Sequence, residues 1–118
     1  MIKWVNYLTN MTITISTKNI SLDEALENFV REKIGGLDKL IGNDKSKARV
    51  EIGKPSRHHK SGRVFRAEAN IRMGGVLLRA TCEHEDLRNA IVDIKDELQE
   101  QIRKFKEKRT DLARQPKK

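Results

Sequence analysis

The sequence predicts an α+β domain with the element order β-α-β-β-β-α, in which two helices pack on one face of a four-stranded mixed sheet. Four short segments alternate apolar and polar residues, which is typical of strands with one buried face. Two longer segments repeat apolar residues every three or four positions, which is typical of helices with one buried side. Because a helix separates the first two strands, we expect them to be parallel, and we expect the remaining pairs to be antiparallel.

The first strand is expected over residues 12–17, where isoleucines alternate with threonine and serine. Residues 1–10 show no comparable pattern, and we interpret them as an N-terminal extension that is not part of the domain. The domain is predicted to span residues 11–110. Residues 111–118 are expected to form a short, basic and disordered tail.

A helix is predicted over residues 22–41. Its start has two alternative N-caps: Ser21 and Glu24 match a capping box, and Asp23 is an equally suitable cap. The pair Gly35–Gly36 weakens a helix by about 1 kcal/mol per glycine relative to alanine, so we expect the last turns to depend on packing. The apolar positions at helical spacing are Ala25, Leu26, Phe29, Val30, Leu37 and Ile41.

Three strands are expected in the middle of the chain. The first of them covers residues 48–52 and ends before Pro55, and the second covers residues 65–73, with strict alternation of apolar and polar side chains. Gly74–Gly75 is a two-residue hairpin signal, so the next strand begins at once and runs over about 76–82. These strands are therefore joined by hairpins.

A long C-terminal helix is predicted to begin near residues 83–86, where acidic residues suit a helix start. Its apolar stripe consists of Leu87, Ile91, Ile94, Leu98, Ile102 and Phe105. Its end is densely basic, with Arg103, Lys104, Lys106, Lys108 and Arg109. One flank of the stripe carries Arg88, Lys95, Gln99 and Lys106, and the other carries Glu97, Gln101, Lys104 and Lys108. Such a helix could bind a polyanion through its basic end. The alternative is a purely structural helix whose charged flanks are solvated and form ion pairs with each other.

The composition narrows the possible partners. The chain has 118 residues, enough for one domain, with 25 Lys and Arg against 17 Asp and Glu and a formal net charge of +8. Nucleic acid, an anionic membrane and an acidic protein would all attract this charge. The chain shows neither a membrane-spanning segment nor a signal peptide, so we expect a soluble, cytoplasmic protein without a membrane partner. The single Cys82 is expected to be a buried thiol on a strand.

Nothing in the sequence indicates catalysis. The adjacent histidines in the basic loop 56–62 diverge in direction and lack accompanying ligands, so we expect no metal site there or at His84. For that loop we consider two alternatives: it contacts phosphate or RNA, or it forms a solvated hairpin. The acids Glu83, Glu85 and Asp86 fit a helix start, and no nucleophile lies nearby. We therefore expect a protein that is not an enzyme and has neither a cofactor nor a small-molecule substrate.

Three short motifs and the element order resemble one family. The motifs are Gly-Val-Leu at 75–77, His-Glu-Asp-Leu at 84–87 and Ala-Ile at 90–91, at the start of the basic-ended helix. Together they resemble the ribosome hibernation-promoting factors, which include the ribosome-associated inhibitor called protein Y and are also known as sigma-54 modulation proteins. The similarity covers about residues 11–110, and the chain is most similar to the short type of this family.

The resemblance implies a translation inhibitor that acts by occlusion. It implies binding to the small (30S) subunit and to 16S rRNA within 70S ribosomes, in the channel for mRNA and tRNA. Ribosomes would be silenced or would hibernate under stress or in stationary phase. The free protein is expected to be a monomer. Because only 4% of the residues are aromatic, we expect binding through phosphates and shape, with strong salt dependence.

The resemblance also implies individual RNA-binding positions. The family's basic sites fall at Lys33, Lys39, Glu97, Glu100, Lys104 and Lys108, so two of them are reversed in sign here. Arg88 stands where the family has an aromatic residue, and we hypothesise that Arg88, Lys95 and Arg103 compensate from neighbouring positions. The predicted RNA-binding residues are Lys33, Lys39, Arg88, Lys95, Arg103, Lys104, Lys106, Lys108 and Arg109.

Two other functions compete with this interpretation. The α-β-β-β-α portion is reminiscent of a general double-stranded RNA-binding module, but acids replace the lysines that such modules carry at the entry to their last helix. The other alternative is a regulator that binds a protein such as an alternative sigma factor, for which the family's older name is the only support.

Overall fold

The computed structural model describes residues 11–42, 45–55 and 64–114, and side chains as far as residue 110. The predictions for residues 1–10, for the loop 56–62 and for the last four residues of the tail lie outside this part of the chain. The elements are β1 (Met11–Lys18), α1 (Glu24–Gly35), α2 (Asp38–Ile41), β2 (Ser46–Gly53), β3 (Phe65–Met73), β4 (Val76–His84) and α3 (Leu87–Arg114).

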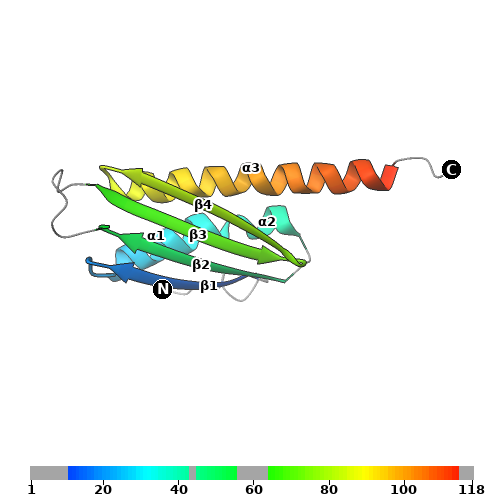
Figure 1. Ribbon diagram of the computed structural model, residues 1–118. Helices are drawn as coiled ribbons and strands as arrows, with labels where there is room; N and C mark the ends of the chain where they lie inside the picture. The colour runs from blue at the N-terminus through cyan, green and yellow to red at the C-terminus, as the bar shows by residue number, and fades with distance from the viewer. Residues whose placement is uncertain (1–10, 43–44, 56–63, 115–118) are drawn as a thin grey trace.

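The four strands form one mixed sheet in the order β1-β2-β3-β4 (Figure 1). β1 is parallel to β2, and the β2–β3 and β3–β4 pairs are antiparallel, which confirms the predicted topology. The register aligns the apolar positions across the sheet: Ala48 of β2 lies between Ile13 of β1 and Ile71 of β3. Because side chains alternate along a strand, this register gathers the apolar residues on one face.

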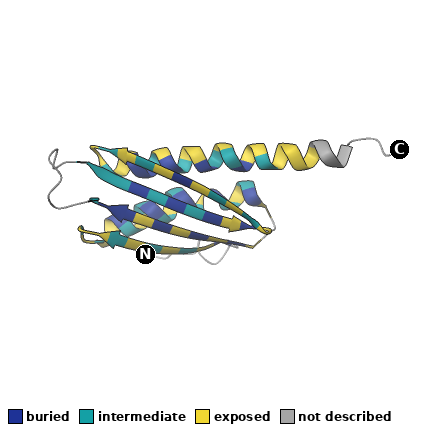
Figure 2. Ribbon diagram, in the orientation of Figure 1, coloured by how far each residue is buried: buried dark blue, intermediate teal, exposed yellow. Residues whose placement is uncertain are grey.

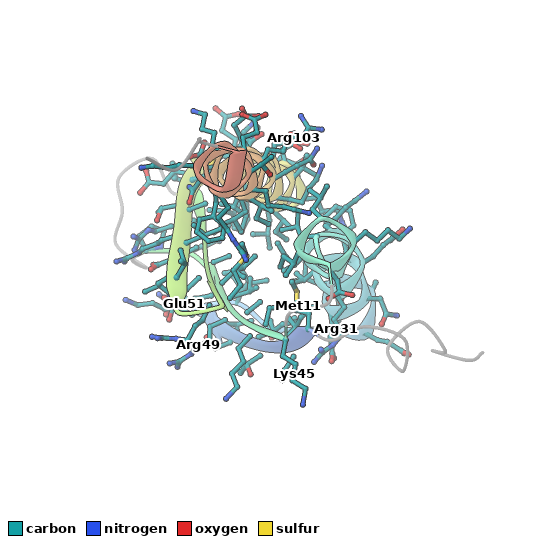
Figure 3. The ribbon with its side chains drawn as sticks, turned by 90° about the vertical axis from the view of Figure 1, so that its right-hand side faces the viewer. Met11, Arg31, Lys45, Arg49, Glu51 and Arg103 are labelled. Carbon is teal, nitrogen blue, oxygen red and sulfur yellow. The ribbon has the colours of Figure 1, made fainter. Side chains whose placement is uncertain are left out.

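Both long helices cover that apolar face, as predicted. α3 packs on β3 and β4, α1 packs on β1, and the two helices contact each other. Figure 3 shows the helices together on one side of the curved sheet, and Figure 2 shows buried residues alternating with exposed ones along the strands. The largest fully buried side chains are Ile34, Leu37, Ile52, Ile71, Ile91, Ile94, Leu98, Ile102, Val30 and Val50. Among the described residues, no helix covers the opposite face of the sheet.

The predicted helix over residues 22–41 is divided in two, which corrects its expected continuity. Asp23 is the N-cap of α1, since its side chain accepts a hydrogen bond of 2.7 Å from the Leu26 N–H. After Gly36, the Leu37 N–H donates to the Ile34 carbonyl, three residues back instead of four, and α2 starts anew. The glycine pair therefore ends α1, while the buried Leu37 and Ile41 keep the following turn on the core.

α3 begins directly after the acidic residues that were predicted to mark its start, and it ends later than predicted. The Asp86 side chain accepts hydrogen bonds from the Arg88 N–H (2.9 Å) and the Asn89 N–H (3.2 Å), so it caps the first turn. The backbone stays helical to Arg114. The first four residues of the predicted tail are therefore helical. The helix continues past its last core contact because it contains neither glycine nor proline as far as Arg114.

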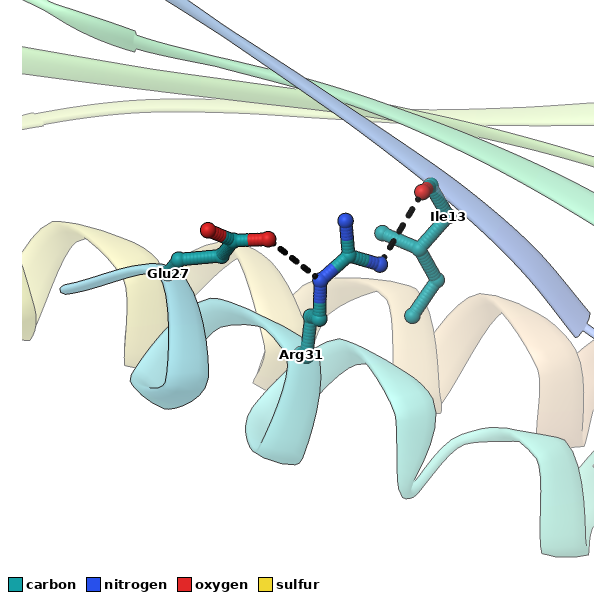
Figure 4. A network of polar contacts seen from close by, with 3 residues as sticks. All are labelled: Ile13, Glu27 and Arg31. Carbon is teal, nitrogen blue, oxygen red and sulfur yellow. Dashed lines mark hydrogen bonds and ion pairs between the residues drawn. The ribbon is translucent and has the colours of Figure 1, made fainter. Parts of the chain in front are cut away.

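A helical side chain reaches a backbone carbonyl on each outer strand of the sheet. At β1, the Arg31 guanidinium donates to the Ile13 carbonyl (3.2 Å) while its Nε donates to Glu27 (3.0 Å), as Figure 4 shows. At β4, the Gln101 amide of α3 donates to the Arg79 carbonyl (2.8 Å). Each contact satisfies a carbonyl that would otherwise be open to another strand.

Candidate nucleic-acid interface

Phe29 is the point at which cations from the two long helices meet. The Arg88 guanidinium of α3 lies 4.8 Å from the centroid of the Phe29 ring, and the Lys33 ammonium of α1 lies 5.5 Å from it. Phe29 is partly buried, so the ring holds both side chains at the surface between the helices. Two predicted RNA-binding residues are therefore brought together, although 55 positions separate them in the sequence.

A second link between the helices lies further along. The Lys106 ammonium donates to the Leu40 carbonyl of α2 over 2.6 Å. Lys106 thus lies on the side of α3 that faces α1 and α2, as Arg88 does. We call this side, with Lys33, Arg88, Lys95 and Lys106, the interhelical surface. Lys95 follows Arg88 by two turns on the same flank, and its ammonium pairs with the exposed Asp96 (2.6 Å).

The remaining predicted residues lie elsewhere on the helices. Arg103 is exposed on the side of α3 away from the sheet (Figure 3). Lys104 and Lys108 follow Gln101 by three and seven residues, so they share its flank, which faces β4 and not α1. The Arg109 guanidinium lies 5.4 Å from the Phe105 ring centroid. Lys39 is exposed on α2. The nine predicted cations therefore do not form one cluster.

Sequence reasoning missed the role of Phe29. Its helical spacing marked it only as a core position, whereas its ring supports the cations of both helices. A signal was present in the sequence: Arg88 occupies a position where the resembled family has an aromatic residue, and a guanidinium stacks well on an aromatic ring. Which ring it would find could not be predicted, because the pairing of α1 with α3 is a tertiary contact.

Polar residues near the start of α3 have structural contacts. The His84 Nδ1 accepts a hydrogen bond from the Asp86 N–H (2.9 Å), which tightens the turn between β4 and α3. Cys82 lies on β4 as predicted, but it is partly exposed instead of buried. Burial, followed by a hydrogen bond from the thiol to the Asp93 carboxylate (3.4 Å), raises the pKa of Cys82 above its ordinary value. This environment disfavours the thiolate, which is the nucleophilic form.

Two further features bear on the class of site. Among the described residues, no three His, Cys, Asp or Glu side chains are grouped so that they could hold a metal ion. Within the same part of the chain, no helix combines the length and the apolar character that crossing a membrane requires. The site that the structure does present is a set of cations on the helices.

Fold and charge define a small basic α+β domain whose cation-bearing helices share one side of a mixed sheet. Residues 13–110 match the family described as sigma 54 modulation protein / S30EA ribosomal protein, and the chain belongs to this family. The ribosome hibernation promotion factor of Staphylococcus aureus (strain COL) is 30% identical over 88 residues, which are 75% of this chain and 44% of that protein. The chain thus spans less than half the length of this curated relative.

Solved structures show the same fold. The N-terminal domain of Thermus thermophilus Protein Y superposes with a TM-score of 0.69 and 27% identity, over 82% of this chain and 99% of that one. A ribosomal subunit interface protein from Coxiella burnetii superposes with a TM-score of 0.69 and 16% identity, over 81% of this chain and 98% of that one. The second likeness concerns the fold alone. The first agrees with the predicted membership of the hibernation-factor family.

Proposed function

We propose that this protein is a non-enzymatic inhibitor of translation that binds the small ribosomal subunit. It occupies the channel for mRNA and tRNA by contacting 16S rRNA, and it silences ribosomes or makes them hibernate under stress or in stationary phase. The observation that carries the proposal is the meeting of Lys33 and Arg88 over Phe29, with Lys106 on the same side, in a chain of the S30EA family. The name of the Staphylococcus relative supports a ribosomal partner.

The chemistry of the interhelical surface favours phosphate contacts. Lys33 and Arg88 are held by an aromatic ring and Lys106 by a backbone carbonyl, and neither kind of contact neutralises a positive charge; Lys95 differs, because it pairs with Asp96. The free N–H groups of Lys33, Arg88 and Lys106 therefore remain available to phosphate oxygens. Arg88 presents a planar donor fork, which suits a phosphate better than a point charge does. Inhibition then requires only that the bound domain fills space that mRNA and tRNA need, so no reacting group is called for.

Co-sedimentation with purified 30S subunits through a sucrose gradient tests the proposal. The combined substitution Lys33→Gln, Arg88→Gln and Lys106→Gln should weaken binding at least tenfold, because a net loss of about 1.4 kcal/mol is enough for that factor. A matched control, Lys18→Gln, Lys54→Gln and Arg66→Gln, removes the same charge from positions at the ends of β1, β2 and β3 that take no part in the interhelical surface, and it should bind nearly as the unchanged protein does. Translation in a purified system should recover with the first variant only.

The alternative functions give different results in the same experiment. Equal affinity for plain duplex RNA and for 30S subunits would indicate a general double-stranded RNA-binding module. Association with a sigma factor that survives nuclease treatment, without sedimentation alongside 30S subunits, would indicate a protein-binding regulator. Either result would overturn the ribosomal proposal.

A further inference from the structure

The helix-free face of the sheet carries a group of cations that the sequence analysis did not single out. They lie toward the end of the sheet at which β3 turns into β4, and all are exposed. Figure 3 shows Arg49 on the side of the sheet opposite the helices. We call this group the sheet patch; it consists of Lys47, Arg49, Arg72 and Arg79.

Strand register brings these side chains close together. Lys47 of β2 lies directly opposite Arg72 of β3. Arg49 and Arg79 flank Asn70 on either side, from β2 and β4. Neighbouring strands are about 4.8 Å apart and alternate residues of one strand about 6.8 Å apart, so the four cations occupy an area of roughly 7 by 10 Å. Such an area can contact consecutive phosphates of one nucleic-acid strand.

The charges of the sheet patch are largely unneutralised. Arg79 pairs with Glu68 (2.6 Å), whereas Lys47, Arg49 and Arg72 form no ion pair within the described part of the chain. Like charges directly opposite each other destabilise a sheet, and Lys47 and Arg72 are such a pair. Further along the same face, Glu51 and Glu68 form a pair of like negative charges. This pair differs from Lys47 and Arg72, because Glu68 is neutralised by Arg79 and also contacts Arg66 (3.5 Å). The fold therefore keeps a repulsive basic pair that an anionic partner would relieve.

We propose that the sheet patch binds the phosphodiester backbone of an RNA strand, as a second surface on the face opposite the helices. Charge complementarity selects a polyanion. The patch is bordered by Thr12, Thr14, Asn70 and Leu77, with the carboxylates Glu51 and Glu68 further along β2 and β3. None of these side chains is an aromatic ring for base stacking, so the contact is to phosphates. The geometry stands independently of the proposed function, and only the choice of RNA as the polyanion rests on it.

Two of the predicted residues that lie outside the interhelical surface are located beside the sheet patch. The hydrogen bond from Gln101 to the Arg79 carbonyl holds one flank of α3 against β4. Lys104 and Lys108 continue along that flank. They extend the sheet patch around the β4 edge, so the domain presents cations to RNA on two sides.

Binding of a fluorescein-labelled oligouridine, followed by fluorescence anisotropy at several salt concentrations, tests the proposal. The combined substitution Lys47→Gln, Arg49→Gln and Arg72→Gln should weaken binding at least fivefold. The slope of log affinity against log salt should fall by about 2, because three phosphate contacts at about 0.7 each are lost. The matched control, Lys18→Gln, Lys54→Gln and Arg66→Gln, should change affinity less than twofold. All substituted side chains are polar, and thermal melting verifies that each variant is folded.

Two results would overturn the sheet patch as an RNA site. One is equal loss of oligouridine binding in the sheet variant and its control. The other is unchanged oligouridine binding in the sheet variant together with lost binding of a labelled polyglutamate peptide, which would assign the patch to an acidic protein. Failure of the proposed function is a separate result: the unchanged protein would not sediment with 30S subunits, yet the sheet variant would still lose oligouridine affinity.

Discussion

Phe29 combines two roles that are usually separate, because one face of its ring packs toward the core and the ring also supports cations from two helices. Arg88 and Lys33 both lie within 6 Å of its centroid, the range in which a ring attracts a cation. The ring thereby fixes where two charges stand without neutralising either. A carboxylate at this position would hold them as well but would cancel the attraction for phosphate.

Replacing Phe29 with leucine should remove the ring that attracts Arg88 and Lys33, while the side-chain volume changes little. In a double-mutant cycle with Arg88→Gln, followed by urea denaturation, we expect a coupling free energy of about 0.5–1 kcal/mol. The same cycle of Phe29→Leu with Lys18→Gln, at a position exposed on the helix-free face of the sheet, should be additive. Additivity in both cycles would show that the Arg88 guanidinium gains nothing from the ring.

Cys82 should resist alkylation at neutral pH. Burial, followed by the hydrogen bond to Asp93, raises the pKa of the folded thiol, so less thiolate is present than in the unfolded chain. Iodoacetamide should therefore react with the folded protein only at higher pH than with the urea-unfolded protein. Asp93→Asn should lower the pKa of Cys82 and speed the reaction. Asp96→Asn, three residues further along α3, should leave both the pKa and the reaction rate unchanged.

The same shift in pKa has a consequence for stability. Between the ordinary thiol pKa and the raised pKa of folded Cys82, the unfolded chain has lost a proton that the folded chain retains. The contribution of this thiol to the free energy of unfolding therefore falls as the pH rises from the ordinary to the raised pKa. Cys82→Ala should remove this part of the pH dependence, and urea denaturation at a series of pH values would reveal it. An identical pH dependence in both proteins would contradict the assignment.

At the scale of elements, the strands were predicted more accurately than the first helix. Strict alternation over residues 65–73 predicted β3 with its observed bounds, because the two-residue period is unambiguous when one face is buried. The division of α1 from α2 was not predicted. Helical periodicity continues from Val30 to Ile41 across the break, so the core contacts alone do not reveal that the backbone hydrogen bonds are interrupted at Gly36.

The glycines around this break should respond oppositely to alanine. Gly36 has an ordinary helical φ of −62°, and an added Cβ would lie 3.4 Å from the Glu32 carbonyl oxygen. Gly36→Ala should therefore raise the free energy of unfolding by about 0.5 kcal/mol. Gly42 ends α2 with a φ of +88°, so Gly42→Ala should lower it by about 1 kcal/mol. Urea denaturation measures both, and the reverse order would contradict the assigned backbone conformations.

For the molecule as a whole, the positive charge is distributed over two sides of one thin domain. The sequence predicted that cations would lie outside the core, because helical and strand periodicity assign the buried face. It did not predict which flank of α3 faces α1 and which faces β4, since that depends on how the helix lies on the sheet. The sequence did separate the flank of Arg88 from the flank of Lys104 and Lys108, and the structure adds that the first faces α1 and the second faces β4.

Binding to 30S subunits should be steeply dependent on salt for the whole molecule. If the interhelical surface and the sheet patch each contribute three phosphate contacts, raising the salt concentration from 50 to 200 mM should lower affinity by roughly a thousandfold. The triple variant of the interhelical surface and the triple variant of the sheet patch should each make this dependence less steep, and their combination should reduce it further. Sedimentation across a salt series measures the slopes, and a slope unchanged by either variant would contradict contact through these cations.

The last turns of α3 project beyond the sheet, as Figure 1 shows, and after Phe105 every described side chain is exposed. Amide protons in this overhang have little packing to protect them, so they should exchange with deuterium early in the free protein. A ligand that binds the basic end of α3 would slow that exchange, whereas a ligand bound only near Phe29 would leave it unchanged. The exchange rates of the last turns therefore show how far along the helix a partner makes contact.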